Sequence, residues 1–272
     1  MPPAQALAAL ALLAAPLVLP ASAAAAGLPP AASGLPDGEE DKGERVEIVT
    51  GDKLVLVGSY YPGRSTKQVS PGALLVHDAG GQRADLDVLA ARLQRQGFAV
   101  LVLDLRGHGN SAKAGLDWES MAPAERERLW AFAMRDLKAG SEWLRTQPAV
   151  HAASVSLVGV RAGCTLAVRQ AVRDETVRSL VLLDPQAEQL GFNLAKDLEA
   201  LGGLPTYIGV SKEEHSKAQR LAEFSQRGNG GIDFIQIATF KAPGTTLLSD
   251  SRVPADIARW MMQKAVPGKG DR

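Results

Sequence analysis

The segment Gly159-Val160-Arg161-Ala162-Gly163 places one charged side chain between two glycines, where an apolar run passes into a segment of helical period. A sharp turn at such a junction would expose its middle side chain, and enzymes that form covalent intermediates do so through a nucleophilic side chain such as serine or cysteine. The middle residue here is Arg161. Its guanidinium stays protonated and has no lone pair with which to attack a carbonyl carbon. The chemistry that remains open to it is the binding of a carboxylate or phosphate through paired N–H groups.

Other side chains that could act as an acid, a base or a ligand follow apolar runs that predict strands. His77 and Asp78 come directly after the run Ala73–Val76, and Glu213 and Glu214 follow a later run. Ligands of open α/β sheets bind beyond the carboxyl ends of the strands, so these side chains are candidates for one site. His77 and Asp78 are adjacent in sequence and point in different directions, which makes them a poor pair of metal ligands.

The single cysteine has two interpretations. Cys164 lies one helical turn after the glycine-flanked turn, where a small side chain packs beneath a helix, so we interpret it as a buried, inert thiol. The alternative is a displaced nucleophile that uses His215 or His77 as its base. The four histidines do not have metal-ligand spacing, so the sequence predicts no metal and no cofactor.

The apolar pattern predicts strands that alternate with helices. Val46–Val49 and Leu54–Tyr61 are expected to form an antiparallel hairpin around a Gly-Asp turn. The later runs indicate a mostly parallel sheet that is covered by helices on both faces. The strands expected after the hairpin are Ala73–Val76, Phe98–Leu103, Val155–Val158, Val177–Leu183, Thr206–Val210 and Ile232–Ile237. The expected helices are Leu86–Leu93, Pro123–Thr146, Ala162–Arg173, Gln189–Leu201, Lys212–Arg227 and Val253–Lys264.

Three loops at the ends of these strands resemble those of the α/β-hydrolase superfamily. Leu75–Gly81 resembles the oxyanion loop, Leu103–Ser111 the D-x-R-G-H-G-x-S loop, and Gly159–Gly163 the G-x-S-x-G nucleophile elbow. The resemblance extends from Val46 to the last helix and is closest to dienelactone-hydrolase-like and related esterase or peptidase members. It implies an α/β-hydrolase fold: a mostly parallel central sheet of about eight strands, helices on both faces, and a minimal lid.

The resemblance also implies a degenerate catalytic triad. The nucleophile position of the family falls on Arg161, and the base position falls on Pro243. The acid position follows the Thr206 strand, where Glu214 is the best match and Glu213 is its neighbour. An active triad needs a nucleophile, a histidine and a carboxylate, so two of the three members are missing at these positions.

The oxyanion hole of the family is built from backbone N–H groups, which survive changes of side chain. Here they would come from Ala79, or Asp78, and from Ala162. The candidates for ligand binding at the same site are Arg161, His77, Asp78 and Glu214. Two interpretations of the arginine stay open. It forms an internal salt bridge with Glu214, Glu213 or Asp78, which we favour, or it holds an anionic small molecule or a protein partner at the former active site.

Three functions are consistent with these residues. The first is an exported pseudo-hydrolase that acts by binding, because the nucleophile and base positions carry Arg161 and Pro243. The second is an active carboxylic-ester, lactone or peptide hydrolase with relocated catalytic groups, such as Cys164 with a histidine. The third is a structural domain of an envelope assembly.

The first 26 residues predict a secretory signal peptide. Ala6–Leu19 is almost wholly apolar, and Ala21-Ser22-Ala23 supplies a small-x-small cleavage pattern. The apolar run is shorter than the roughly 20 residues that span a bilayer. We therefore expect a periplasmic or secreted protein with no membrane span after removal of the signal. No Lys or Arg precedes the apolar run, so a misassigned start or an Ala-rich leader of another kind is the alternative.

Composition completes the predicted organisation. Residues 27–45, rich in Pro, Gly and acidic side chains, are expected to form a disordered linker before one domain over 46–265 and a flexible tail over 266–272. The chain has 30 Lys and Arg against 30 Asp and Glu, which gives no electrostatic case for binding nucleic acid. Nothing in the sequence indicates an oligomeric state.

Overall fold

The computed structural model describes residues 43–64, 69–231, 234–241, 247–248, 250 and 252–265. The predicted signal peptide, most of the predicted linker and the predicted tail lie outside these residues. No helix in the described part of the chain is both long and apolar enough to cross a membrane. The described residues belong to one unit of the chain, Asp37–Arg272.

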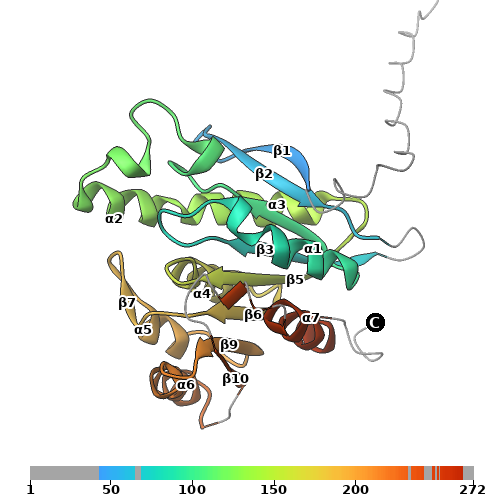
Figure 1. Cartoon of the computed structure of the whole chain (residues 1–272), viewed down its shortest axis with the longest axis vertical. Coiled ribbons are helices and arrows are strands. Elements are labelled where there is room, and N and C mark those ends of the chain that lie inside the picture. Colours follow the sequence, from blue (N-terminus) through green and yellow to red (C-terminus); the bar gives the residue numbers. More distant parts are fainter. Residues whose placement is uncertain are drawn as a thin grey trace, which may run out of the picture. The chain divides into compact units, whose positions relative to one another are not determined.

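One sheet of eight strands forms the centre of this unit (Figure 1), in the order β1-β2-β4-β3-β5-β6-β9-β10. β1 pairs antiparallel with β2, and β2 pairs antiparallel with β4. All other neighbours in this sheet are parallel. The strands are β1 (Glu44–Val49), β2 (Val55–Tyr61), β3 (Ser70–Val76), β4 (Ala99–Leu103), β5 (Val150–Val160), β6 (Val177–Leu183), β9 (Thr206–Ser211) and β10 (Ile235–Phe240). The predicted hairpin and the mostly parallel sheet of about eight strands are therefore confirmed.

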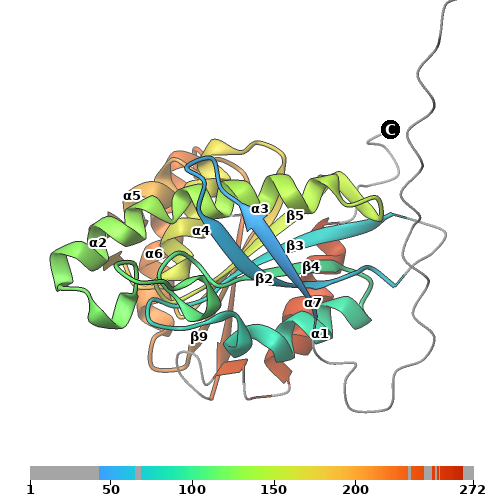
Figure 2. The same cartoon turned by 90° about the horizontal axis from the view of Figure 1, so that it is seen from above.

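Helices cover both faces of this sheet. The helices are α1 (Asp87–Arg95), α2 (Pro123–Phe132), α3 (Met134–Thr146), α4 (Gly163–Arg173), α5 (Leu194–Glu199), α6 (His215–Gly228) and α7 (Arg252–Ala265). Three short 3-10 segments lie at Arg83–Leu86, Gly109–Ser111 and Trp118–Ser120. Helices α1 and α7 pack beside each other in the core of one face (Figure 2). Helices α2 to α6 contribute to the core of the other face.

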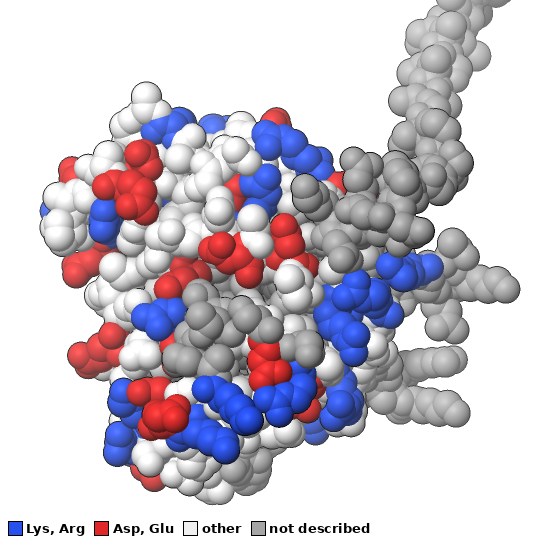
Figure 3. Space-filling model, viewed as in Figure 1, with Lys and Arg blue, Asp and Glu red and all other residues white. Residues whose placement is uncertain are grey.

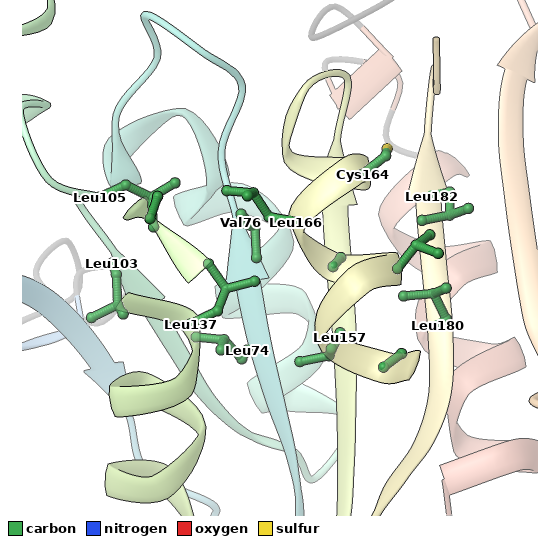
Figure 4. Packing of buried hydrophobic residues seen from close by; sticks show 14 of the residues in the cluster. Leu74, Val76, Leu103, Leu105, Leu137, Leu157, Cys164, Leu166, Leu180 and Leu182 are labelled. Atoms are coloured by element: carbon green, nitrogen blue, oxygen red, sulfur yellow. The ribbon is translucent and has the colours of Figure 1, made fainter. Parts of the chain in front are cut away.

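The continuous apolar runs arise because each parallel strand is buried on both sides. On β3, Leu74 and Val76 point into the core beneath α3 and α4, as Figure 4 shows, while Ala73 and Leu75 belong to the opposite core. Side chains that alternate between two apolar cores need no polar positions between them. The same alternation occurs on β6, where Leu182 and Leu183 enter different cores.

Two of the expected helices differ in the structure. The single helix predicted over 123–146 is interrupted at Ala133, where α2 ends and α3 begins. The helix predicted from Gln189 begins only at Leu194, because a short hairpin of β7 (Glu188–Gln189) and β8 (Phe192–Asn193) precedes it. Leu190 and Gly191 both have positive φ, at 50° and 76°, which makes the tight hairpin turn and prevents a helix there.

The loop after β4 is held by buried ion pairs. Asp104 accepts hydrogen bonds from the backbone N–H groups of Arg83 and Asn110 at 2.8 and 2.9 Å, and it also pairs with the Arg83 guanidinium. Arg106 donates to Asp136 Oδ1 from Nε at 2.9 Å and from Nη2 at 2.7 Å. Buried charges are tolerated only when they are paired in this way, so the loop has one well-defined path.

The register of the parallel strands decides which residues meet at the carboxyl edge of the sheet. Val76 lies opposite Gly159, and Val160 lies opposite Leu183. The residues that follow β3, β5 and β6 therefore emerge side by side at one edge.

Two glycines allow α4 to approach this edge closely. A Cβ atom on Gly163 would lie 2.5 Å from the carbonyl oxygen of Val76 and 2.6 Å from that of His77. A Cβ atom on Gly159 would lie 2.7 Å from the backbone of Cys164. Neither position can carry a side chain unless the strand and the helix move apart.

Gly163→Ala is expected to lower the free energy of unfolding by about 1–3 kcal/mol, because the added methyl group meets two backbone oxygens that cannot move independently. Chemical denaturation measures the loss. Gly51→Ala is the matched control, since a Cβ atom there meets nothing within 4 Å. An unchanged stability for Gly163→Ala would contradict the close approach.

Candidate active site

Arg161 occupies a left-handed turn between β5 and α4. Its φ is 48°, a conformation that residues with a Cβ atom adopt only at an energetic cost. Its backbone N–H donates to the carbonyl oxygen of Leu183 at 2.8 Å, which continues the β5–β6 pairing. Ala162 and α4 follow directly. The turn predicted from the two glycines is therefore present, and its middle side chain is an arginine.

The guanidinium of Arg161 lies between two carboxylates. Nε donates to Asp78 Oδ2 at 2.9 Å, and Nη1 donates to Asp184 Oδ2 at 2.9 Å. The side chain of Arg161 is 37% exposed, whereas that of Asp184 is only 5% exposed. Asp78 was one of the three acidic partners that the sequence suggested, and Asp184 was not among them.

Asp184 directly follows β6 and, like Arg161, has a positive φ, of 51°. Burial raises the pKa of its carboxyl, and the Arg161 guanidinium opposes this rise. The negative charges of Glu214 and Asp78 raise its pKa further. The sequence contained a signal for Asp184 as a site residue, because an acidic side chain follows the apolar run of β6 just as Asp78 follows that of β3.

Glu214 lies at the start of α6, where its carboxylate pairs with Lys217 at 2.6 Å. Of the three partners suggested for an internal salt bridge with Arg161, the described contacts contain Asp78 and neither Glu214 nor Glu213. Glu213 is exposed, and the residues that do bind the guanidinium come from the ends of β3 and β6. Glu214 acts on this site at longer range, through its effect on the pKa of Asp184.

Two backbone N–H groups converge on one point beside Arg161. Ala79 and Ala162 both donate to Asp78 Oδ1, at 2.8 and 3.0 Å. These are the two groups that the resemblance assigned to an oxyanion hole. The oxygen that they bind in this structure belongs to the chain itself.

His77 holds the loop that carries Asp78. Its Nδ1–H donates to the carbonyl oxygen of Asp78 at 2.6 Å, and its Nε2 accepts the N–H of Leu105 at 3.0 Å. The ring is fully buried, and burial lowers its pKa to about 4. Both ring nitrogens of His77 are thus bonded inside the protein, which favours a structural role for this residue over contact with a ligand.

His108 stabilises the same loop from the other side. Its Nε2 accepts the N–H of Gly80 at 3.1 Å, and its Nδ1–H donates to the carbonyl oxygen of Arg106 at 2.9 Å. Burial lowers the pKa of His108 as well. The indole ring of Trp118 lies 4.7 Å from the imidazole, centre to centre. Two neutral histidines thus fix the loop between β3 and α1.

Cys164 is fully buried at the start of α4 (Figure 4). Its thiol donates to the carbonyl oxygen of Gly159 at 3.2 Å, and burial raises its pKa well above the usual value. A thiol with a raised pKa and no exposure forms little thiolate, so it is a poor nucleophile. The interpretation of Cys164 as a packed, inert side chain agrees with these contacts.

Pro243, the predicted base position, lies outside the described residues, so the structure does not place it. Within the described ranges, no group of three or more His, Cys, Asp or Glu side chains could hold a metal ion.

The sequence pattern of the dienelactone hydrolase family matches residues 59–223, which is more than half of the chain. The chain belongs to the dienelactone hydrolase family. An esterase from Pyrococcus furiosus superposes on it with a TM-score of 0.65 and 14% identity, over 88% of this chain and 99% of that one. A dienelactone hydrolase from Anabaena variabilis gives a TM-score of 0.63 and 18% identity, over 82% of this chain and 98% of that one. No curated protein matches the chain.

These likenesses identify the eight-stranded sheet as that of an α/β-hydrolase fold. In this dienelactone hydrolase family member, the left-handed turn at Arg161 joins β5 to α4. At this turn Arg161 pairs with two carboxylates, and the N–H groups of Ala79 and Ala162 both already have Asp78 as their acceptor.

Arg161→Ala is expected to lower the free energy of unfolding by about 2–3 kcal/mol at pH 7, because it leaves the buried Asp184 carboxylate without its cation. Ala keeps the Cβ atom, so the backbone strain is unchanged. Without the guanidinium the native-state pKa of Asp184 rises further above its unfolded value, so the native state binds the extra proton. The loss should therefore shrink as the pH falls from 7 towards 5.

Urea denaturation across this pH range measures the effect. Lys217→Ala is the control, because it breaks the more exposed pair with Glu214 and should cost no more than about 1 kcal/mol. Equal losses in the two variants, or a loss for Arg161→Ala that does not depend on pH, would contradict the buried network.

His77 should make the stability of this family member sensitive to acid. Its native pKa of about 4 lies below the unfolded value of about 6.5, so the unfolded chain binds the proton first as the pH falls. Stability should therefore decline between pH 6.5 and 4, by about 1.4 kcal/mol per pH unit for each such histidine. The slope of the unfolding free energy against pH should be smaller in His77→Gln by the contribution of about one proton. Denaturation curves at several pH values measure this slope. The prediction is wrong if wild type and variant show the same slope.

Proposed function

We propose that this dienelactone hydrolase family member is an exported, non-catalytic protein that acts by binding. The observation that carries the proposal is the Arg161 guanidinium, held between Asp78 and Asp184 at the nucleophile position. Arginine provides no nucleophile. The other two positions of the degenerate triad support the same conclusion, because Glu214 pairs with Lys217 and the base position carries Pro243.

The alternative of an active hydrolase with relocated groups would need an accessible Cys164 and a free histidine. Cys164 is buried and has a raised pKa, and His77 uses both ring nitrogens for the loop. His215 belongs to α6, and Cys164 bonds to backbone oxygens rather than to an imidazole among the described contacts. These contacts support binding over relocated catalysis.

The charges around Arg161 and on the surface bear on the kind of partner that this protein binds. The two carboxylates that neutralise Arg161 would repel a small anion, so they favour a protein partner at the former active site. Lys and Arg lie next to Asp and Glu on the face drawn in Figure 3, and the formal net charge is zero. This balance supports a partner other than nucleic acid. The apolar leader supports a periplasmic or secreted location.

The test is a hydrolysis assay of the purified full chain with a panel of aryl esters, together with labelling by a fluorophosphonate probe. We expect rates equal to the buffer blank and no labelled protein, since no activated hydroxyl or thiol stands at the elbow. Cys164→Ala is the matched variant. Hydrolysis or labelling that disappears in Cys164→Ala would overturn the proposal in favour of a relocated nucleophile.

A further inference from the structure

The carboxylate of Asp78 is bound by three donors from two segments of the chain. Oδ1 accepts the N–H groups of Ala79 and Ala162 at 2.8 and 3.0 Å, and Oδ2 accepts Arg161 Nε at 2.9 Å. Hydrogen bonds of this length to a charged acceptor are among the stronger ones in proteins. The side chain of Asp78 is 19% exposed, so little of its carboxylate remains for water.

This set of donors is a receptor for one carboxylate. In an α/β-hydrolase, the two N–H groups receive the negative oxygen that develops on the substrate. Here they receive one oxygen of the Asp78 carboxylate, and the elbow side chain holds the second oxygen of the same group. A substrate or ligand oxygen cannot occupy the hole while Asp78 is in it.

The backbone around Asp78 aims the side chain at this position. Its carbonyl oxygen accepts His77 Nδ1–H at 2.6 Å and the N–H of Gly81 at 2.9 Å. The next residue but one, Gly80, is held by His108 Nε2 at 3.1 Å. A main chain that is fixed on both sides leaves the carboxylate few alternative positions. The loop conformation itself therefore places Asp78 against the N–H groups of Ala79 and Ala162.

We propose that Asp78 is an internal ligand that keeps the oxyanion hole closed, and that removal of its carboxylate opens a site for a small external carboxylate. The donors of that site are the N–H groups of Ala79 and Ala162 and the guanidinium of Arg161. This inference rests on the proposed non-catalytic function for its biological meaning. Its test measures acetate binding at the hole and does not depend on hydrolysis. The inference and the proposed function can therefore fail separately.

The experiment compares wild type, Asp78→Ala and Asp78→Asn in thermal unfolding, with and without 100 mM sodium acetate. Asp78→Ala should unfold roughly 5–10 °C lower than wild type, because two N–H groups lose their acceptor and the Arg161 guanidinium loses one of its two carboxylate partners. Acetate should restore about 3–5 °C when its concentration is ten times its dissociation constant. Wild type should shift by less than about 1 °C, because its hole is already filled.

Asp78→Asn tests the same point with less disturbance. Its amide oxygen can still accept the two N–H groups, so the hole stays filled and acetate should give no rescue. Sodium chloride at equal ionic strength and acetamide, the neutral analogue of acetate, control for salt and for shape. Asp197→Ala is the matched control variant, since it removes a carboxylate from Arg169 at a place with no converging backbone N–H groups.

Amide NMR signals of Ala79 and Ala162 give a second readout. Both signals should move in Asp78→Ala and return towards their wild-type positions as acetate is added. Equal acetate shifts for wild type and Asp78→Ala would overturn the inference, because the hole would then be open in the native chain. It would also be overturned if acetate left both amide signals of Asp78→Ala unmoved. If Asp78→Ala does not fold, Asp78→Asn carries the test: movement of its Ala79 and Ala162 signals on addition of acetate would overturn the inference, because the amide oxygen should keep the hole filled.

Discussion

The Arg161 guanidinium between Asp78 and Asp184 is the interaction on which the rest of the site depends. The three residues follow β3, β5 and β6, so one side chain ties together three neighbouring strand ends. Two of them adopt positive φ, which costs on the order of 1–3 kcal/mol each. The buried carboxylate of Asp184 would be costly without a cation. The ion pairs of Arg161 therefore neutralise the buried Asp184 carboxylate and offset the backbone strain of these two residues at the same place.

The backbone conformation of the turn at Arg161 does not depend on the chemistry of the Arg161 side chain. Gly159 and Gly163 allow α4 to lie against β5 and the end of β3, whether a serine or an arginine occupies the turn. The same backbone also keeps the N–H group of Ala162 directed at the Asp78 carboxylate. The glycines therefore set the path of the backbone, whereas function has to be argued from the side chains that the backbone presents.

Two buried histidines and a set of buried ion pairs give the site its rigidity. His77 and His108 each use Nε2 to connect the loop after β3 to the loop after β4, and each uses Nδ1–H to bond a carbonyl oxygen of its own loop. Asp104, with Arg83, and Asp136, with Arg106, hold the second loop. Because these groups are buried and paired, the Asp78 carboxylate has a fixed position opposite Arg161.

The sequence by itself determined the architecture and the elbow, because apolar periodicity and glycine spacing are local properties that the chain displays directly. It predicted the hairpin, the parallel strands and the turn at Arg161, but a helix at Gln189 was wrong, since the positive φ of Leu190 carries no periodic signal. Only the tertiary structure decided what neutralises Arg161. Strand order and register bring Asp184 beside it, and they place the Asp78 carboxylate within reach of the N–H groups of Ala79 and Ala162. Contacts between residues more than 80 positions apart depend on that register, and no local pattern encodes it.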